Sequence, residues 1–247
     1  APGFRPERVW DTAFSGDIRL GVFETKKELP AGIRIQSGIC NAKLHNVSVG
    51  DNTCIENIHS YIANYNIGSG CIIENVDKIY TEGMSSFGNG VEVRVLNESG
   101  GREVPINNKL TAHFAYILAL YRHKTELVKR MQELVSTYSK KVSSDRGTIG
   151  DNVTISHSGI IKNVVIGEGC FLDYGSIVRE NTCVGNDVKI YANSVINSNT
   201  IIGDNVHVFE GAVIGKRPFS PGCTSRAISN EFRTLNIGNN TVVNPNV

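Results

Sequence analysis

Histidine is the side chain in this sequence best suited to proton transfer at neutral pH, because its unperturbed pKa of about 6.5 lies close to that pH. The chain holds six histidines. We expect His207 to be a general base that takes a proton from a hydroxyl or an amine, with His157 as the second choice. Glu210 follows His207 by three residues and is the candidate to orient its imidazole. No Ser-His-Asp order, zinc-ligand spacing or paired-carboxylate motif stands out, so no metal is predicted.

A cationic segment lies shortly after His207. Its sequence, GKRPFSPGCTSRAISNEFRT, gathers cations that suit the phosphates of an anionic ligand, namely Lys216, Arg217, Arg226 and Arg233. We expect residues 216–233 to form a protruding loop that binds such a ligand. The alternative is a surface loop whose charges are only solvated.

The elements that must position these residues follow a six-residue period. Aliphatic residues recur at every sixth position, at Ile166, Leu172, Val178, Val184, Ile190, Ile196, Ile202, Val208 and Ile214. A mostly small residue lies four positions after each of the first eight. Gly167, Gly185 and Gly203 recur at intervals of eighteen, which indicates coils of three short strands with residues eighteen apart stacked on one another. His207 lies between two inward residues and is therefore expected to point out of the coil.

A less regular form of the same period occurs earlier, at Val49, Ile55, Tyr61, Ile67, Ile73 and Ile79. Asn57 and Asn75 are eighteen apart, and we expect their amides to bond along the stack. In this register His59 and Tyr65 take inward positions that are otherwise small, and His59 is expected to be packed. The spacing from Ile149 to Ile166 is seventeen, a slip that a coil corner can absorb.

Residues 109–141 change to an apolar spacing of threes and fours, which predicts one long amphipathic helix. Thr111, Asn107 or Asn108 could cap its start. The helix is basic, and we expect a solvated face docked along the coils, with phosphate or partner binding as the alternative. The glycine-rich connector before it lacks both phosphate-loop motifs, so its glycines are expected to serve turns.

Together these patterns predict an all-β, parallel β-helix interrupted by one long α-helix. The expected divisions are a lead-in at 1–32, a first β-helix part at 33–95, the connector and helix at 96–146, and a second β-helix part at 147–247.

The strings VIGEGCFLDYGSIV and IIGDNVHVFEGAVIG resemble the hexapeptide-repeat acyltransferase family. That resemblance implies a left-handed coil, a homotrimer with sites at the subunit seams, and acyl-CoA, in particular acetyl-CoA, as co-substrate. Residues 1 to about 165 also resemble a longer group of bacterial hexapeptide-repeat proteins with no assigned reaction, through strings such as FSGDIRLGVF and TAHFAYILALYRH.

Composition limits the partners. With 25 Lys+Arg against 24 Asp+Glu, the net charge of +1 gives no reason to expect nucleic acid or an acidic membrane surface. No apolar run approaches the roughly 20 residues of a membrane span. The 6 cysteines form no CxxC pair, which favours a reducing cytoplasm.

The leading hypothesis is an acyl-CoA-dependent O- or N-acyltransferase acting on a sugar or a nucleotide sugar, with His207 as base. The alternative is a non-catalytic β-helix, either a scaffold or a regulatory domain of the kind attached to sugar-nucleotide transferases.

Overall fold

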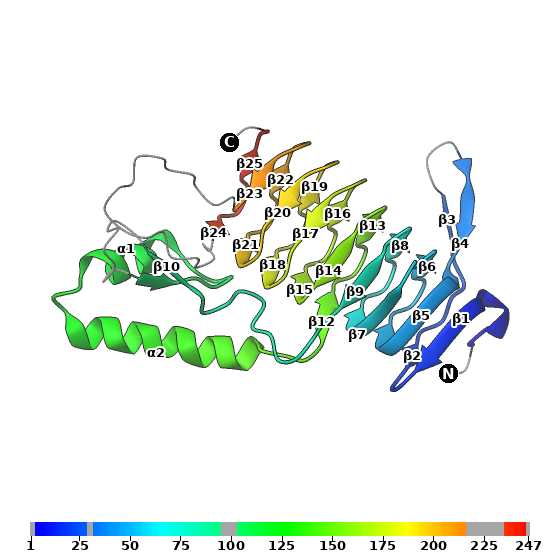
Figure 1. Cartoon of the computed structure of the whole chain (residues 1–247), viewed down its shortest axis with the longest axis horizontal. Coiled ribbons are helices and arrows are strands. Elements are labelled where there is room, and N and C mark those ends of the chain that lie inside the picture. The colour runs from blue at the N-terminus through cyan, green and yellow to red at the C-terminus, as the bar shows by residue number, and fades with distance from the viewer. Residues whose placement is uncertain (1–2, 29–31, 95–102, 216–234, 246–247) are drawn as a thin grey trace.

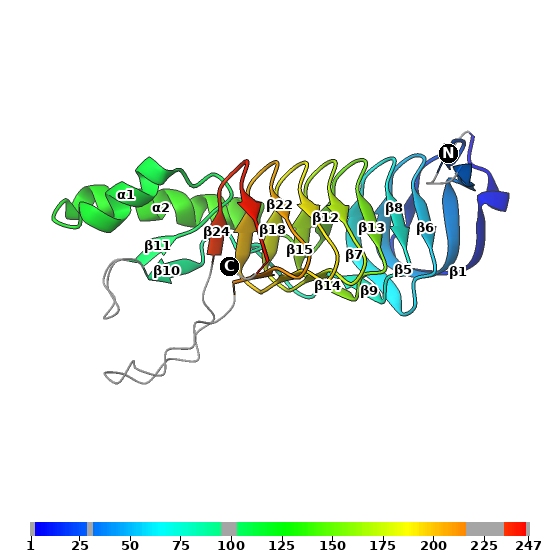
Figure 2. The same ribbon diagram turned by 90° about the horizontal axis from the view of Figure 1, so that it is seen from above.

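The computed structural model describes residues 3–28, 32–94, 103–215 and 235–245. It is a column of parallel β-coils with a small α/β insertion (Figure 1). The coils are stacked in chain order along the long axis, and the insertion lies toward the C-terminal end of the column (Figure 2). The predicted parallel β-helix is confirmed.

Each coil turns through three faces. Face 1 holds β2 (Arg19–Leu20), β12 (Gly147–Ile149), β15 (Val164–Ile166), β18 (Thr182–Val184), β21 (Thr200–Ile202) and β24 (Leu235–Ile237). Face 2 holds β6 (Cys54–Glu56), β8 (Ile72–Glu74), β13 (Thr154–Ser156), β16 (Phe171–Leu172), β19 (Lys189–Ile190), β22 (His207–Val208) and β25 (Val242–Val243). Face 3 holds β9 (Lys78–Tyr80), β14 (Ile160–Lys162), β17 (Ile177–Val178), β20 (Val195–Ile196) and β23 (Val213–Ile214).

Three longer strands bend through the corners and join the faces: β1 (Val9–Ser15), β5 (Gly38–Val49) and β7 (Tyr61–Ile67). A short 3-10 helix, Pro6–Arg8, precedes β1, and an antiparallel pair, β3 (Lys26–Glu28) and β4 (Arg34–Gln36), lies beside the N-terminal coils. Most corners turn through a residue with positive φ, usually asparagine, which tolerates that region better than most residues do.

The core is the line of inward residues predicted from the six-residue period. All nine predicted aliphatic positions from Ile166 to Ile214 are buried, and so are the eight mostly small positions between them. Because parallel strands stack them in register, each coil buries its apolar side chains against the coils on either side. Asn57 donates to Asn75 over 3.3 Å, so the expected amide stack is confirmed.

Two placements in the early coils were wrong. Tyr61 and His59 are exposed, and the neighbouring Ile62 and Ile58 point inward instead. The reason is that the strands here step by unequal lengths, since Ile55 to Ile62 is seven residues and Ile62 to Ile67 is five. The prediction applied a six-residue period to residues 55–67, where the strands do not follow it.

Tyr65 does point inward, and its hydroxyl bonds to the strand that follows the short corner at Asn163. Its hydroxyl donates to the carbonyl of Val164 over 2.7 Å and accepts from the amide of the same residue over 3.2 Å. The Tyr65 ring occupies the space where Gly147 has no side chain, because a Cβ there would lie 2.3 Å from the ring carbon Cζ. The corner at Asn163 is one residue shorter than the later ones, so a corner absorbs the slip as expected.

The insertion contains two helices where one was expected. Helix α1 spans Ala112–Leu120 and α2 spans Thr125–Val142, with a turn between them. Thr111 caps α1, since its Oγ1 accepts from the amide of Phe114 over 3.2 Å. The strands β10 (Glu92–Arg94) and β11 (Glu103–Pro105) form an antiparallel pair beside the helices. None of the described helices has both the length and the apolar character needed to cross a bilayer.

Candidate functional site

His207 lies on face 2, in the position that the period predicts. It is half-buried and points outward from β22 between the inward residues Val206 and Val208. Its Nδ1 lies 3.4 Å from the hydroxyl of Tyr191, which is a long hydrogen bond. Nothing in the described part of the chain bonds to its Nε2. If Nδ1 donates to the tyrosine oxygen, Nε2 keeps a free lone pair that can accept a proton.

Two aromatic rings flank this imidazole. Tyr191 and Phe209 are stacked, with centroids 5.3 Å apart and planes 20° apart. The His207 ring lies 6.1 Å from the ring of Tyr191 and 6.4 Å from that of Phe209. The three rings form a half-buried platform that an apolar or ring-shaped ligand can cover.

Lys189 adds a cation to the same face. It is the register partner of His207 on the adjacent strand, and its side chain is exposed. No salt bridge to Lys189 is found within the described residues, so its charge is free to meet an anionic group of a ligand.

The other predicted site residues do not join this group. Glu210 is exposed and forms no hydrogen bond or ion pair in the ranges that the structure covers, and Tyr191 rather than Glu210 contacts the imidazole. Lys216, Arg217, Arg226 and Arg233 lie outside the described residues. The strands on either side of that segment, β23 and β24, lie on faces 3 and 1, whereas His207 lies on face 2.

Sequence reasoning missed Tyr191, Phe209 and Lys189. The period held the signal, because Lys189 precedes His207 by eighteen residues and Tyr191 precedes Phe209 by the same interval. Outward residues one coil apart are neighbours. Partners of His207 are therefore expected about eighteen residues away in the sequence rather than three.

His157 lies in a different setting. It occupies the corner between faces 2 and 3 with a positive φ of 51°, at the end of the asparagine ladder. Asn41 donates to Asn57 over 3.1 Å, Asn57 to Asn75 over 3.3 Å, and the Asn75 amide nitrogen lies 3.2 Å from Nε2 of His157. Since the oxygen of Asn75 already accepts from Asn57, Asn75 must donate to His157.

The second nitrogen of His157 is bonded as well. Its Nδ1 lies 2.8 Å from Oγ of Ser156, and that hydroxyl donates to Oε1 of Glu74 over 2.7 Å. The imidazole is therefore held in its Nδ1-protonated tautomer, with Nε2 accepting from Asn75. Neither nitrogen is free for a substrate, so the geometry favours His207 over His157 as the candidate base.

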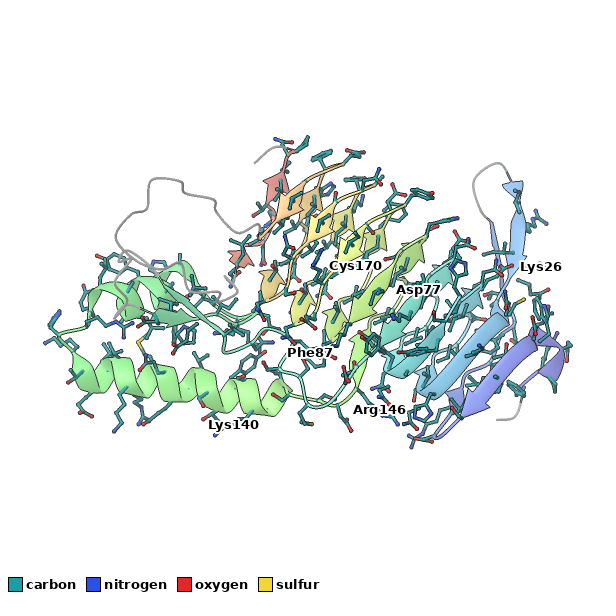
Figure 3. The ribbon with its side chains drawn as sticks, in the orientation of Figure 1. Lys26, Asp77, Phe87, Lys140, Arg146 and Cys170 are labelled. Carbon is teal, nitrogen blue, oxygen red and sulfur yellow. The ribbon has the colours of Figure 1, made fainter. Side chains whose placement is uncertain are left out.

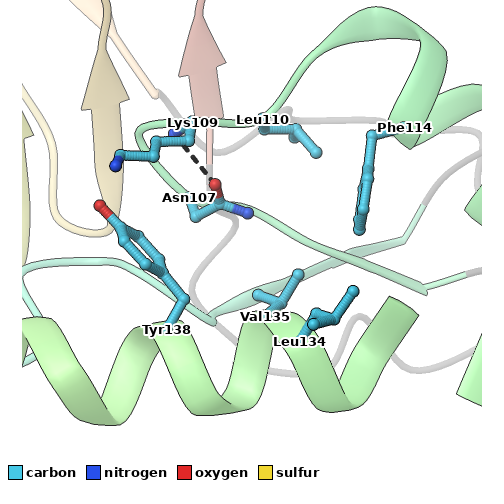
Figure 4. A pocket seen from close by; sticks show the side chains of 7 residues that line it. All are labelled: Asn107, Lys109, Leu110, Phe114, Leu134, Val135 and Tyr138. Atoms are coloured by element: carbon cyan, nitrogen blue, oxygen red, sulfur yellow. Dashed lines mark hydrogen bonds between the residues drawn. The ribbon is translucent and has the colours of Figure 1, made fainter. Parts of the chain in front are cut away.

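Two shallow hollows lie elsewhere on the surface, away from His207. One, of about 160 Å³, lies between the connector and α2 and is lined by Asn107, Lys109, Leu110, Phe114, Leu134, Val135 and Tyr138 (Figure 4). The other, of about 250 Å³, lies near the N-terminal coils, where Ser15 bonds Nδ1 of His45 over 2.8 Å. Both are smaller than the roughly 300–1,000 Å³ of typical small-molecule pockets, and neither includes His207.

Two of the cysteines in the described part of the chain are buried and poorly suited to act as nucleophiles. Burial raises the pKa of the Cys170 thiol, labelled in Figure 3, and of the Cys183 thiol to about 11, so both stay protonated and unreactive at neutral pH. Cys40, Cys170 and Cys183 are free thiols. In the ranges that the structure describes, no three His, Cys, Asp or Glu side chains gather closely enough to hold a metal ion.

Comparison with known proteins places the chain in a family. The model of the domain of unknown function DUF4954 matches residues 1–233. The chain belongs to the DUF4954 family. This corrects the assignment to the hexapeptide-repeat acyltransferase family. The match also continues past residue 165, where the resemblance to the longer bacterial group was expected to end.

A relative in Treponema pallidum (strain Nichols), described as an uncharacterized protein, is 26% identical over 210 residues. The match covers 77% of this chain and 29% of the relative, so the DUF4954 chain spans less than a third of that protein's length. Neither comparison carries an activity to this chain.

Proposed function

We propose that this chain is an acyltransferase that moves the acyl group of an acyl-CoA, in particular acetyl-CoA, to a hydroxyl or an amine of a sugar or nucleotide sugar. The observation that supports it is the setting of His207, with Nδ1 beside the Tyr191 hydroxyl and Nε2 without a partner in the described chain. A base in this setting takes the proton of the acceptor while the acceptor oxygen or nitrogen attacks the thioester carbonyl. The carbon–sulfur bond then breaks, and the CoA sulfur leaves and is protonated.

The neighbours of His207 fit such an acceptor. The stacked rings of Tyr191 and Phe209 offer an apolar surface to one face of a sugar ring or a base. Lys189 lies one strand away and suits a phosphate of a nucleotide sugar. The cations expected to hold the CoA phosphates remain those of residues 216–233.

The proposal includes a homotrimer and a cytoplasmic location. The free thiols in the described ranges suit a reducing compartment.

A single experiment tests the chemistry. Thiol release from acetyl-CoA is measured with a panel of amino sugars and nucleotide sugars for the wild type, His207→Asn and His157→Asn. We expect His207→Asn to lower kcat by about a hundredfold or more, as loss of a general base does. The control His157→Asn keeps a side chain that tolerates positive φ and is expected to retain activity. Absence of turnover with every acceptor, together with no calorimetric binding of acetyl-CoA, would contradict the proposal.

The non-catalytic scaffold is the second candidate. It is favoured by the small size of both hollows and by their distance in the fold from His207. It predicts that His207→Asn leaves every property of the protein unchanged, while substitutions on an exposed apolar face abolish partner binding.

A further inference from the structure

An arrangement of asparagine, histidine and serine side chains occurs twice on this column. At the corner of His157, Asn75 donates to Nε2, and Nδ1 donates to Oγ of Ser156 over 2.8 Å. The hydroxyl of Ser156 then donates its own hydrogen to Oε1 of Glu74 over 2.7 Å. The serine of this first arrangement therefore both accepts from the imidazole and donates to a carboxylate of the chain.

The second arrangement joins β1 and β5, which lie side by side at the N-terminal end of the column (Figure 1). The side-chain oxygen of Asn46 accepts from the amide of Asp17 over 2.9 Å, so it is the nitrogen of Asn46 that lies 3.0 Å from Nε2 of His45. Nε2 must then accept, and Nδ1 carries the proton that it donates to Oγ of Ser15 over 2.8 Å. The Ser15 hydroxyl keeps its own hydrogen for another acceptor.

The two serines differ in what takes that hydrogen. In the described part of the chain, the side chain of Ser15 bonds to His45 alone, whereas Ser156 also donates to Glu74. An anionic oxygen of a ligand suits Ser15 in the way that the carboxylate suits Ser156. Ser15 is not set up as a nucleophile, because His45 donates to its oxygen instead of accepting its proton.

Ser15 and His45 line the hollow of about 250 Å³ near the N-terminal coils. Phe14 and Tyr61 also line it, and they are 43% and 38% exposed, so two aromatic side chains are open to a ligand there. Lys43 is the third kind of lining residue, and none of the described acidic side chains forms an ion pair with it. The polar groups left free in the hollow, the Ser15 hydroxyl hydrogen and the Lys43 ammonium, are both donors, which suits an anion rich in acceptor oxygens.

The charges around the hollow also favour an anion. Lys78 is the register partner of Tyr61 on the next strand of face 3, and its ammonium lies 6.0 Å over the ring of Tyr80. Neither Lys78 nor the exposed Arg179 further along face 3 has an ion pair in the described ranges. The acidic residues beside Ser15 and along face 3 are already bonded within the chain, namely Asp17 to Arg19 and Arg146, Asp77 to Ser60, and Glu82 and Glu180 to Lys162.

We propose that this hollow binds a small phosphomonoester, with the phosphate at Ser15 and Lys43 and a single ring against Tyr61. A phosphate dianion suits a hollow with one lysine in its lining and a second on the adjacent strand, because lysine is a common phosphate ligand. The volume is below that of a typical small-molecule pocket, so it suits one ring rather than a nucleotide sugar. The site goes beyond the proposed acyl transfer and does not depend on it, since the candidate base lies on face 2.

Isothermal titration calorimetry of the 247-residue chain with phenyl phosphate tests the proposal. We expect saturable binding by the wild type. Ser15→Ala and Lys43→Gln should each raise the dissociation constant about tenfold, because each removes a hydrogen bond to a charged group. Ser15→Thr keeps the hydroxyl and is expected to bind within about threefold of the wild type. Lys140→Gln is the matched control for Lys43→Gln, because Lys140 is also an exposed lysine but lies on α2.

Two further ligands show what the hollow recognises. Inorganic phosphate has no ring to cover Tyr61 and is expected to bind at least about tenfold more weakly than phenyl phosphate. Glucose 6-phosphate carries its phosphate on a sugar ring instead of an aromatic one. Binding of either ring-bearing ligand supports the site, and the tighter of the two identifies the kind of ring that it takes.

Three results would overturn the proposal. The first is no saturable binding of either ring-bearing ligand up to about 10 mM. The second is binding that Ser15→Ala or Lys43→Gln leaves unchanged, or that Lys140→Gln weakens equally, since another site or general positive charge then accounts for it. The third is inorganic phosphate binding as tightly as phenyl phosphate. Circular dichroism checks that each variant is folded, and no thioester is present, so the result is independent of the acyl-transfer assay.

Discussion

The two ends of the column fill the same triangular interior with different residues. In the C-terminal coils, residues 164–214, the interior repeats every six residues and its intermediate positions are mostly small, as at Ser176, Thr182 and Ser194. In the N-terminal coils, residues 38–80, the chain steps by five residues from Ile62 to Ile67, and Tyr65 is buried in the interior. The six-residue period alone is enough to fill the interior of the C-terminal coils, whereas the interior of the N-terminal coils depends on specific contacts such as those of Tyr65.

His157 and His207 lie in these two different parts of the column, and their hydrogen bonding differs. His157 completes the asparagine ladder of the N-terminal coils and has both ring nitrogens bonded. His207 lies on the regular coils and has one nitrogen without a partner among the described residues. Both ring nitrogens of His157 are therefore used in structural hydrogen bonds, whereas Nε2 of His207 is left available for chemistry.

Gly147→Ala should have the largest effect on this comparison. The new Cβ would lie 2.3 Å from Cζ of Tyr65 and 2.7 Å from Oγ1 of Thr81, and the buried ring has no free space to move into. We expect the free energy of unfolding in urea to fall by about 3 kcal/mol, the upper end of typical overpacking costs. Gly159→Ala is the matched control, because nothing lies within 4 Å of its added Cβ. Equal stability of the two variants would mean that Tyr65 does not restrict position 147.

Tyr65→Phe should have the next largest effect. The substitution keeps the ring but leaves the carbonyl and the amide of Val164 without the hydroxyl, at a cost of about 1–3 kcal/mol for buried unsatisfied groups. Tyr61→Phe is the control, because Tyr61 is 38% exposed. Chemical denaturation of both variants beside the wild type measures the difference, and a Tyr65→Phe protein as stable as Tyr61→Phe would contradict this role.

The same variant has a signature at alkaline pH. Burial raises the pKa of Tyr65, so the folded protein keeps this proton where the unfolded chain loses it. A raised pKa in the folded state means that the stabilisation is fully present below the unfolded pKa of about 10 and is lost as the pH rises above it. The wild type should therefore lose up to about 1.4 kcal/mol more per pH unit above pH 10 than Tyr65→Phe does.

These differences show what the sequence could and could not predict. The inward residues from Ile166 to Ile214 were predictable because each hexad has the same chemistry and length, so counting alone places them. The inward placement of Ile58 and Ile62 and the contact of Tyr65 with Gly147 could not be predicted. There the repeat is interrupted by an aromatic ring that fills the space beside a glycine from a distant part of the sequence. For the site, the outward direction of His207 followed from its neighbours. Its contact with Tyr191 joins residues sixteen apart on adjacent coils, which the three-residue spacing to Glu210 does not indicate.

The corner asparagines should give the smallest effect and the finest test of the comparison. Asn57 and Asn193 both have positive φ, 55° and 58°, but only Asn57 belongs to the hydrogen-bonded ladder. Glycine adopts this conformation without strain, so Asn→Gly isolates the side-chain hydrogen bonds. We expect Asn57→Gly to lower the free energy of unfolding by about 1 kcal/mol, measured in urea, and Asn193→Gly by clearly less. If Asn193→Gly cost as much as Asn57→Gly, the ladder would contribute nothing beyond its backbone conformation, and the N-terminal coils would not depend on polar partners in the way their geometry indicates.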